Sequence, residues 1–401
     1  MAAENVRTIP LDTVTDYDKL PSITAIVMVT VLSLFSFDLA MSQSGTILWE
    51  YEIDGQLWAP MKYEGGHLFF GSDNTNFYAF DVAEQAPKWT FKTGGIIRSG
   101  VDITDGLVVF ASDDGFLYAL DAETGVERWR CDLGSTELTR RLPAPGPPYS
   151  YDYLHSSLIY YDGHIYVGSA DHHLYAIDHQ SGEVAWRFST GGQVRSTPHV
   201  DSERVYVGSW DGNLYALDRA TGEQIWKFET PGQIQGSPAA GIGKVYVGSR
   251  SATVYAIDAS TGESSWEYVH ADGSWVESSP VVDDGYVFVG SSDALKLSAF
   301  DAATGDVRWE FNTGGWSWGK PAVANGVVYI GSLSASPYYV EGVDLVNGLF
   351  AVDQQTGTLK WSIETGTIEG YITGGVFSTP VINEGVVYVA GIDGRLLAIR
   401  E

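Results

Sequence analysis

The chain has 401 residues and is strongly acidic, with 51 Asp and Glu against 23 Lys and Arg and a formal net charge of −28 at pH 7. A surface of this charge repels the phosphate backbone of nucleic acids and anionic lipid headgroups, so we expect no nucleic-acid partner. The single cysteine, Cys131, excludes a disulfide within the chain, and we expect it to act as a small buried apolar residue.

Residues 1–44 differ in character from the rest of the chain. An apolar run over residues 21–37 has a core too short for a membrane span and typical of the apolar part of a signal peptide. The twenty residues before it carry four acids and two bases, whereas a signal peptide carries net positive charge there. We expect an exported protein, periplasmic, extracellular or membrane-associated, whose only membrane contact is this segment if it is retained. The alternative is a cytoplasmic protein with a wrongly chosen start codon or a poorly ordered tail.

From residue 45 onward one eleven-residue pattern recurs, A-x-D-x-x-[T/S]-G-x-x-x-W. Seven copies end at Trp89, Trp129, Trp186, Trp226, Trp266, Trp309 and Trp361, and the first of them lacks the Thr-Gly pair. Trp49 has no copy before it, and Ala398 begins a copy that stops at Glu401. Consecutive tryptophans from Trp49 to Trp361 are 40, 40, 57, 40, 40, 43 and 52 residues apart. This period predicts a repeat architecture, and the complementary ends predict a closed ring of eight units.

The sequence of each unit predicts four short strands. Within residues 194–230, stretches rich in β-branched and aromatic residues are separated by turns at Asp211-Gly212 and at Asp218 to Gly222. Four strands per forty residues are typical of a propeller blade. The prediction is an all-β, eight-bladed β-propeller of four-stranded antiparallel blades over residues 45–401. Its last blade would be closed by the N-terminal strand around Trp49.

The repeated motif resembles the tryptophan-docking motif of the quinoprotein-type eight-bladed propellers. That superfamily includes pyrroloquinoline-quinone (PQQ) dehydrogenases and the non-enzymatic, BamB-like outer-membrane assembly lipoproteins. The resemblance covers about residues 45–401 and implies that each repeat tryptophan docks between adjacent blades. It leaves function open, because the superfamily holds both enzymes and scaffolds. The chain lacks both the vicinal cysteine pair of the dehydrogenases and the lipoprotein cysteine that follows a signal segment.

Features outside the repeat predict a binding face. With strands A to D running from the axis outward, B–C turns and D–A links lie on one face of a propeller. All five tryptophans outside the repeat map to that face, as do two insertions, residues 133–154 with Arg140-Arg141 and residues 333–348. Surplus aromatic residues on one face indicate a binding site, the alternative being a plug for the central channel. Long loops without secondary structure are usually functional or disordered.

A second set of positions is expected at the mouth of the central channel. It lies three residues before the proline that opens each blade, or at the equivalent position, and reads Leu57, Arg98, His155, Arg195, Gln235, Glu277, Trp318 and Phe377. An anionic ligand between Arg98 and Arg195 is one interpretation, and a satisfied polar network with water is the other. Five histidines fall between His155 and His179, but their turns lie on opposite faces, so we expect no metal site.

The sequence therefore predicts a non-catalytic binding or scaffolding propeller without a cofactor, which presents its B–C and D–A loop face to a protein or peptide partner. The alternative is a PQQ-dependent oxidoreductase with PQQ and calcium in the channel, and a third interpretation is a small-anion or carbohydrate sensor using the same face. The candidate partner-binding residues are Trp275, Trp316, Trp318, Trp58, Trp210, Arg98, Arg195, Glu277 and His155.

Overall fold

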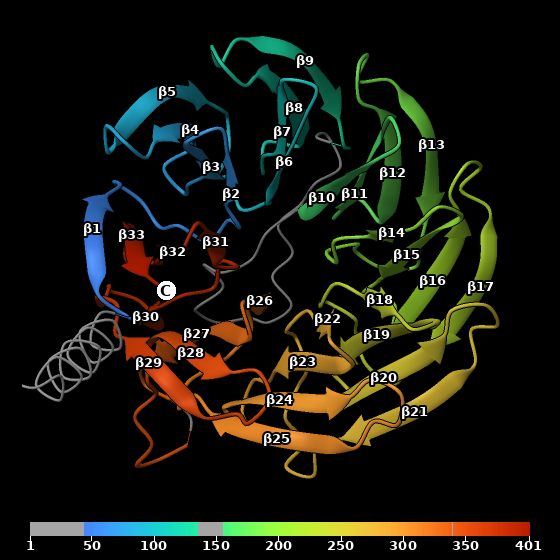
Figure 1. Ribbon diagram of the computed structural model, residues 1–401. Coiled ribbons are helices and arrows are strands. Elements are labelled where there is room, and N and C mark those ends of the chain that lie inside the picture. The colour runs from blue at the N-terminus through green and yellow to red at the C-terminus, as the bar shows by residue number, and fades with distance from the viewer. Residues whose placement is uncertain (1–43, 135–154, 339) are drawn as a thin grey trace, which may run out of the picture. The chain divides into compact units, whose positions relative to one another are not determined.

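The computed structural model describes residues 44–134, 155–338 and 340–401. Residues 1–43, with the apolar run, and residues 135–154, with Arg140-Arg141, lie outside the described residues. Residues 45–401 form one compact unit in which eight sheets are arranged in a ring (Figure 1). The described residues contain strands and turns but no helix, and therefore no helix that is long and apolar enough to span a membrane. The predicted eight-bladed all-β propeller is confirmed.

The first four blades follow one another along the chain. Blade 1 consists of β2 (Lys62–Glu64), β3 (His67–Gly71), β4 (Asn76–Asp81) and β5 (Ala86–Lys92). Blade 2 consists of β6 (Val101–Thr104), β7 (Leu107–Ala111), β8 (Phe116–Asp121) and β9 (Glu127–Asp132). Blade 3 consists of β10 (His155–Tyr161), β11 (His164–Ser169), β12 (His173–Asp178) and β13 (Val184–Ser189). Blade 4 consists of β14 (His199–Val200), β15 (Arg204–Gly208), β16 (Asn213–Asp218) and β17 (Gln224–Glu229).

The remaining blades continue this order, and the last one joins both ends of the ring. Blade 5 consists of β18 (Ala239–Gly241), β19 (Lys244–Ser249), β20 (Thr253–Asp258) and β21 (Ser264–Val269). Blade 6 consists of β22 (Val281–Asp283), β23 (Tyr286–Gly290), β24 (Lys296–Asp301) and β25 (Val307–Asn312). Blade 7 consists of β26 (Ala322–Ala324), β27 (Val327–Ala335), β28 (Gly348–Asp353) and β29 (Leu359–Ile363), with β30 (Ile372–Gly375) beside β27. Blade 8 consists of β31 (Val381–Asn383), β32 (Val386–Ala390), β33 (Arg395–Arg400) and β1 (Ile47–Glu52).

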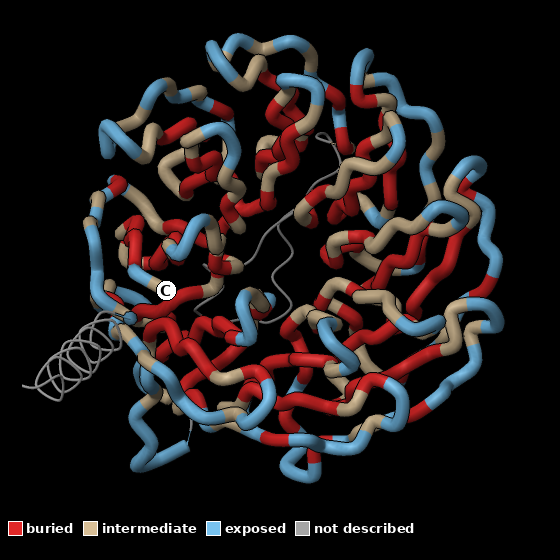
Figure 2. Tube along the Cα trace, viewed as in Figure 1, coloured by how far each residue is buried: buried red, intermediate tan, exposed pale blue. Residues whose placement is uncertain are grey.

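The core lies between the blades rather than at the centre of the ring. The second and third strands of a blade are almost entirely buried, as in β16, because both of their faces pack against neighbouring blades. The outermost strand alternates between exposed and buried residues, as in β17, and Figure 2 shows this change from buried to exposed toward the rim. Cys131 is buried in the apolar cluster between blades 2 and 3, as expected, and burial raises the pKa of its thiol to about 11.

The Asp and Thr of the repeat build the turn between the third and fourth strands. In blade 4 the Asp218 carboxylate accepts hydrogen bonds from the backbone N–H groups of Ala220 at 3.0 Å and Thr221 at 2.9 Å. It also accepts one from the Thr221 hydroxyl at 3.0 Å. These hydrogen bonds lower the pKa of Asp218. Gly222 completes the turn with a φ of +72°, a conformation that glycine adopts without a steric penalty.

The repeat tryptophan docks on the turn of the next blade. The Trp226 indole N–H donates to the Ala259 carbonyl at 3.1 Å, and a Cβ added to Gly262 would lie 2.8 Å from the Trp226 ring. The same 3.0–3.1 Å hydrogen bond joins Trp89 to Ala122, Trp129 to His179, Trp186 to Arg219, Trp266 to Ala302 and Trp309 to Gln354. The repeat glycine therefore has two functions, since it closes its own turn and leaves room for the tryptophan of the preceding blade.

Both ends of the described propeller build blade 8, which confirms the predicted closure. Strand β1 pairs antiparallel with β33. Gly45 N donates to the Arg400 carbonyl at 2.9 Å, as Gly222 N donates to the Asp218 carbonyl at 2.8 Å in blade 4. Gly45 has a φ of +78°, and an added Cβ would lie 2.9 Å from Trp361. Gly45 thus takes the place of the repeat glycine, although it lies about 350 residues away from Arg400 in the sequence.

We predict that Gly45→Ala destabilises the propeller more than Gly65→Ala does. Both glycines have positive φ, at +78° and +58°, so both substitutions strain the backbone. Only Gly45 faces a neighbour, since nothing lies within 4 Å of a Cβ at Gly65. The additional overlap with Trp361 should lower the free energy of unfolding by about 1–3 kcal/mol. Denaturant unfolding of the two variants measures this difference from their midpoints and slopes. Equal midpoints would show that the Gly45 contact does not close the ring.

We also predict that Trp226→Ala lowers the free energy of unfolding by about 3–5 kcal/mol, the range for a buried aromatic residue. Trp275→Ala is the matched control, because Trp275 is 46% exposed and lies outside the repeat. Its substitution should cost well under half as much. Urea denaturation of the two variants beside the parent protein measures both values, and a similar loss in both would contradict a structural role specific to the repeat.

Candidate functional site

Backbone hydrogen bonds bring a B–C turn onto the D–A link that enters the same blade. Trp210 N donates to the Gln193 carbonyl at 3.0 Å, and Ser292 N donates to the Trp275 carbonyl at 3.0 Å. Equivalent bonds occur in every blade except blade 3, whose D–A link lies mostly outside the described residues, so the described B–C turns and D–A links share one face. The five tryptophans outside the repeat belong to these segments and therefore lie on this face.

These five tryptophans differ in exposure. Trp58 and Trp316 are only 2% and 3% exposed and lie in one apolar cluster. Trp316 stacks on Trp318 with ring centroids 4.7 Å apart, and its N–H donates to the Asp293 carboxylate at 3.1 Å. Trp58 and Trp316 thus hold links together from inside, and in this conformation they have almost no surface to offer a partner. Trp275 is the exposed member of the set.

The second insertion forms a strand extension rather than a loop without secondary structure. Strand β27 runs on to Ala335, and its end pairs with β30 from the D–A link that follows blade 7. Leu333 and Ile372, from these two strands, are buried in the same cluster as Trp316. A paired, buried strand pair satisfies its backbone N–H and C=O groups, which an unpaired loop at this depth could not do. Residues 340–344 and 346 are exposed.

Arginines stack on Trp210 and Trp275 and form a row along this face. The Arg195 guanidinium lies 4.2 Å from the Trp210 ring centroid, and that of Arg250 lies 5.1 Å from Trp210 and 4.9 Å from Trp275. Arg250 also forms an ion pair with Glu277 at 2.5 Å. A guanidinium group stacked on an indole ring fixes the orientation of both side chains and covers apolar surface. Arg250 of blade 5 was not among the candidates, and it links the candidate residues of blade 4 with those of blade 6.

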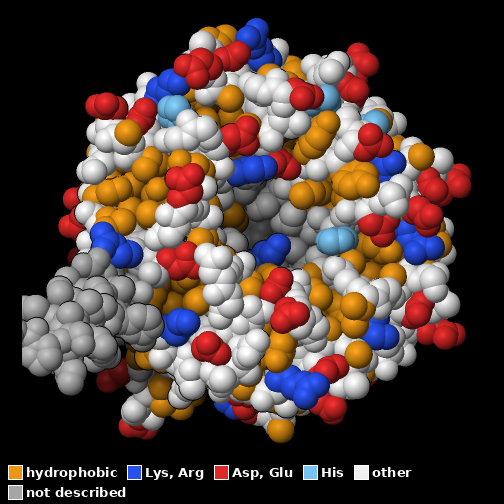
Figure 3. Space-filling view, viewed as in Figure 1, with side chains coloured by type: hydrophobic (Ala, Val, Ile, Leu, Met, Phe, Trp, Pro, Cys, Tyr) orange, Lys and Arg blue, Asp and Glu red, His pale blue; other side chains and the backbone are white. Residues whose placement is uncertain are grey.

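The central channel contains a cavity of about 440 Å³ that opens on the molecular face seen in Figure 3, where basic side chains reach the edge of the hollow. Seven of the eight positions predicted at the channel mouth line this cavity. They are Arg98, His155, Arg195, Gln235, Glu277, Trp318 and Phe377. Leu57 instead belongs to the apolar core between blades 8 and 1. The Arg98 guanidinium lies over Trp58 at 4.8 Å and forms an ion pair with Asp73 at 2.5 Å.

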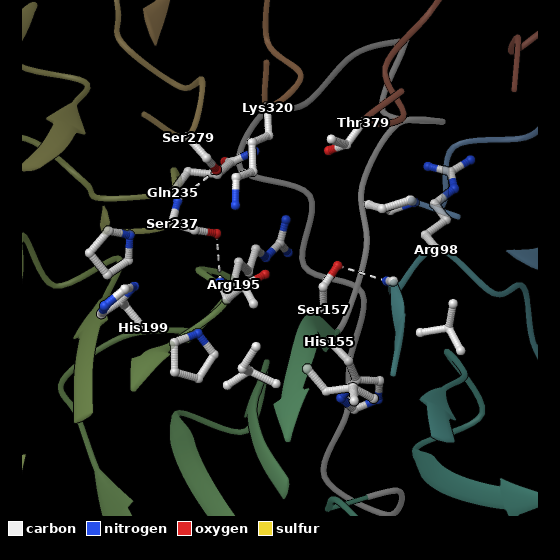
Figure 4. Close-up of a pocket in the computed structure, with 18 of the residues that line it drawn as sticks. Arg98, His155, Ser157, Arg195, His199, Gln235, Ser237, Ser279, Lys320 and Thr379 are labelled. Atoms are coloured by element: carbon white, nitrogen blue, oxygen red, sulfur yellow. Dashed lines mark hydrogen bonds between the residues drawn. The ribbon is translucent and has the colours of Figure 1, made fainter. Parts of the chain in front are cut away.

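A further ring of lining positions was not singled out in the sequence, although the same alignment contains it. It lies immediately before the proline that opens each blade, or at the equivalent position, and contributes Gly100, Ser157, Thr197, Ser237, Ser279, Lys320 and Thr379. Neighbouring blades are joined through this ring, since Gly100 N donates to the Ser157 hydroxyl oxygen at 2.7 Å and Thr197 N to that of Ser237 at 2.8 Å (Figure 4). The repeated hydroxyl residue before proline was the signal that could have identified it.

Burial shifts the protonation of the basic groups in the cavity. Desolvation lowers the pKa of His155 to about 4, and neither of its ring nitrogens has a hydrogen-bond partner among the described residues. Desolvation also lowers the pKa of His199, with a smaller opposing effect from Asp201. The Lys320 side chain is accessible from inside the cavity, yet the surrounding protein desolvates its ammonium group and lowers its pKa.

The carboxylates of this cavity do not fit calcium-bound PQQ. Calcium takes six to eight oxygen ligands, usually with several carboxylates. Glu277 is the one carboxylate among the lining residues that the structure describes, and it is already paired with Arg250. No group of three potential metal-ligating side chains occurs within the described ranges. His179 of the histidine-rich segment pairs with Asp105 at 3.0 Å, away from this cavity.

The ring of eight tryptophan-docked blades defines a propeller of the quinoprotein-like class. The chain belongs to the family described as outer membrane protein assembly factor BamB, whose profile matches residues 37–155, 154–275 and 211–401. No curated protein matches it at a significant level of sequence similarity.

Solved structures of similar fold carry different names. The chain is similar to BamB from Moraxella catarrhalis, with a TM-score of 0.67 and 19% identity over 89% of this chain and 100% of that one. It is similar to Sqt1 from Saccharomyces cerevisiae, with a TM-score of 0.69 and 16% identity over 90% and 100% of the two chains. It also resembles the quinohemoprotein alcohol dehydrogenase from Comamonas testosteroni, with a TM-score of 0.67 and 15% identity over 90% and 77%. At these identities the likeness shows the fold alone.

We predict that His155 makes the stability of the propeller depend on pH between about 4 and 6.5. The pKa of His155 is lower in the folded protein than in the unfolded chain, so the unfolded chain binds the proton first as the pH falls. The free energy of unfolding should therefore fall from pH 6.5 to pH 4, with about 3 kcal/mol as the upper bound for this one group. In His155→Gln this part of the decline disappears. Urea denaturation at several pH values measures it, and parallel curves for the two proteins would contradict the assignment.

Proposed function

We propose that the protein is a non-catalytic binding propeller whose B–C and D–A loop face docks a protein or peptide partner. The family description, an outer membrane protein assembly factor, supports a role in holding other proteins rather than in chemistry. The same description supports an exported location. The alternative of a PQQ-dependent oxidoreductase has support from the fold, but the described cavity lacks the carboxylates that calcium needs.

The observation that carries this proposal is a cluster of exposed apolar side chains on blades 6 and 7. Most exposed large apolar residues of the propeller recur on the outermost strands or the turns before them, as Val184 and Val307 do, and thus follow the repeat. Four others do not follow it and belong to the B–C and D–A face. We call them the blade 6–7 loop surface, and they are Trp275, Val340, Val343 and Val346.

Hydrogen bonds connect the segments of the blade 6–7 loop surface. Trp275 is joined to the next B–C turn through Ser292, and Asp293 in that turn accepts bonds from Trp316 at 3.1 Å and from the Tyr338 hydroxyl at 3.4 Å. Val346 N donates to the Gly314 carbonyl at 2.8 Å. The exposed side chains are therefore held on a pre-organised frame, which reduces the entropy lost on binding.

The charges around this surface indicate the chemistry of the partner. Glu341 and Asp344 lie exposed between the valines, in a chain with a net charge of −28. A partner segment with apolar side chains flanked by basic ones would match both features, because apolar contacts supply binding energy and opposite charges speed association.

We expect a double variant, Trp275→Ala with Val343→Asp, to bind its partner at least tenfold more weakly while keeping its fold. Both side chains are exposed, so the circular dichroism spectrum and the melting temperature should change little. Ile242→Asp is the control, since Ile242 is 61% exposed in an A–B turn on the opposite face.

A photo-crosslinking residue placed at position 275 or at position 242 identifies the partner in extracts of the native cell. Crosslinks to a defined protein from position 275 alone, lost in the Val343→Asp background, support the proposal. Identical crosslinks from both positions, or unchanged affinity of the double variant for the identified partner, would refute it.

A further inference from the structure

We infer that the central cavity binds a small oxyanion, the carboxylate or phosphate group of a small-molecule ligand, through the Lys320 ammonium group and the hydroxyl groups that surround it. This inference is independent of the protein partner proposed above, because the cavity and the blade 6–7 loop surface use different residues.

Lys320 supplies the positive charge. Among the described residues, no carboxylate or hydrogen-bond acceptor contacts its ammonium group, whereas Arg98 is paired with Asp73 and Glu277 with Arg250. Figure 4 shows the Lys320 and Arg195 side chains reaching from the wall into the cavity. A partly desolvated ammonium group without a counter-charge is unfavourable, and an anion beside it would restore both the charge balance and the hydrogen bonds.

The hydroxyl ring supplies hydrogen-bond donors aimed at the same space. The hydroxyl oxygens of Ser157, Ser237 and Ser279 each accept a backbone N–H from the adjacent blade, at 2.7, 2.8 and 2.9 Å. Each hydroxyl hydrogen is then left to donate, and the described residues offer it no acceptor. Thr379 adds another lining hydroxyl without a described partner. Several convergent O–H donors beside an ammonium group select an acceptor-only ligand such as a carboxylate or phosphate oxygen.

His155 strengthens this assignment from the opposite side of the cavity. It lines the cavity, is almost fully buried, and has no partner for either ring nitrogen among the described residues. Buried polar groups are nearly always hydrogen-bonded, so an orphaned pair of nitrogens indicates a bound molecule or water. A neutral imidazole can donate one N–H to a ligand oxygen and accept from a ligand hydroxyl.

The size and walls of the cavity define the ligand further. A volume of about 440 Å³ suits a small organic molecule rather than a polymer. Apolar walls from Met61, Phe377 and Trp318 face the polar ring and could pack against a hydrocarbon part of the ligand. The ligand class is therefore a small organic acid or a phosphorylated small molecule.

The test measures anion binding to the isolated protein by isothermal titration calorimetry and thermal unfolding at fixed pH and ionic strength. Inorganic phosphate and succinate are the probes, and chloride is the reference anion. We expect saturable binding and a rise in melting temperature with at least one probe. The better probe distinguishes a phosphate site from a carboxylate site.

Three variants assign the binding to the cavity. Lys320→Met, which keeps most of the side-chain length, should weaken binding at least tenfold, and Thr379→Val, which replaces a hydroxyl by a methyl group, should weaken it several-fold. Lys227→Met removes the same charge from an exposed outer strand and should bind as the parent protein does. Circular dichroism without added anion checks that each variant is folded.

Two results would overturn the inference. One is the absence of saturable binding of phosphate and of succinate to the parent protein. The other is binding to Lys320→Met with parental affinity, since the anion would then be held elsewhere. Neither result affects the proposed docking of a protein partner, which is measured by crosslinking at position 275.

Discussion

The contact between a tryptophan and a glycine of the next blade is the constraint on which the rest of the propeller depends. The indole covers a glycine held at positive φ and donates its N–H to a carbonyl in the same turn, so one side chain fixes both the distance and the angle between blades. An indole covers a glycine with positive φ at seven junctions, at positions 45, 125, 182, 222, 262, 305 and 357. The indole hydrogen bond is present at six of them, that is, at all except Gly45. The junction between blades 8 and 1 lacks the glycine. There Gln85 takes the left-handed conformation with a φ of +51°, and Trp49 packs on Phe80 with ring centroids 5.7 Å apart.

This constraint divides the surface of the molecule into two kinds. On the face of the C–D turns, the Asp, the Thr or Ser and the Gly of most repeats form the turn and the docking contact, so little can vary there without loss of stability. The B–C turns and D–A links need only backbone hydrogen bonds to one another, and their side chains are free to differ from blade to blade. The exposed loops of blades 6 and 7 are built from these free positions, and so is the part of the cavity lining that precedes the innermost strands.

The periodic part of the structure could be predicted from the sequence, and the non-periodic part could not. The positions of Trp49 and Ala398 within the repeat were enough to predict ring closure, because a period of about forty residues leaves one strand missing at one end and one extra at the other. The role of Gly45 was not predicted, because its partner turn at Arg400 is its neighbour only in space.

The burial of Trp58 and Trp316 was not predictable either, since D–A links follow no period that would separate an inward-facing from an outward-facing indole. The alignment that identified Arg98, His155 and Arg195 already contained Lys320 two positions further along its own blade, but a lysine in a repeat position gives no sign of lacking a counter-charge until its neighbours are known.

The distribution of charge explains how an anion site can exist inside so acidic a protein. Exposed carboxylates repel an approaching anion, but at physiological ionic strength their field decays within roughly 8 Å of the surface. Inside the cavity the nearest charges dominate, and among its described lining residues the basic groups outnumber the carboxylates, of which Glu277 is the one member. The low-dielectric walls strengthen the local interaction with Lys320, and a cavity of about 440 Å³ is too small for a large polyanion. The acidic exterior and the basic cavity are therefore compatible, because the exterior repels nucleic acid while the cavity attracts a small anion.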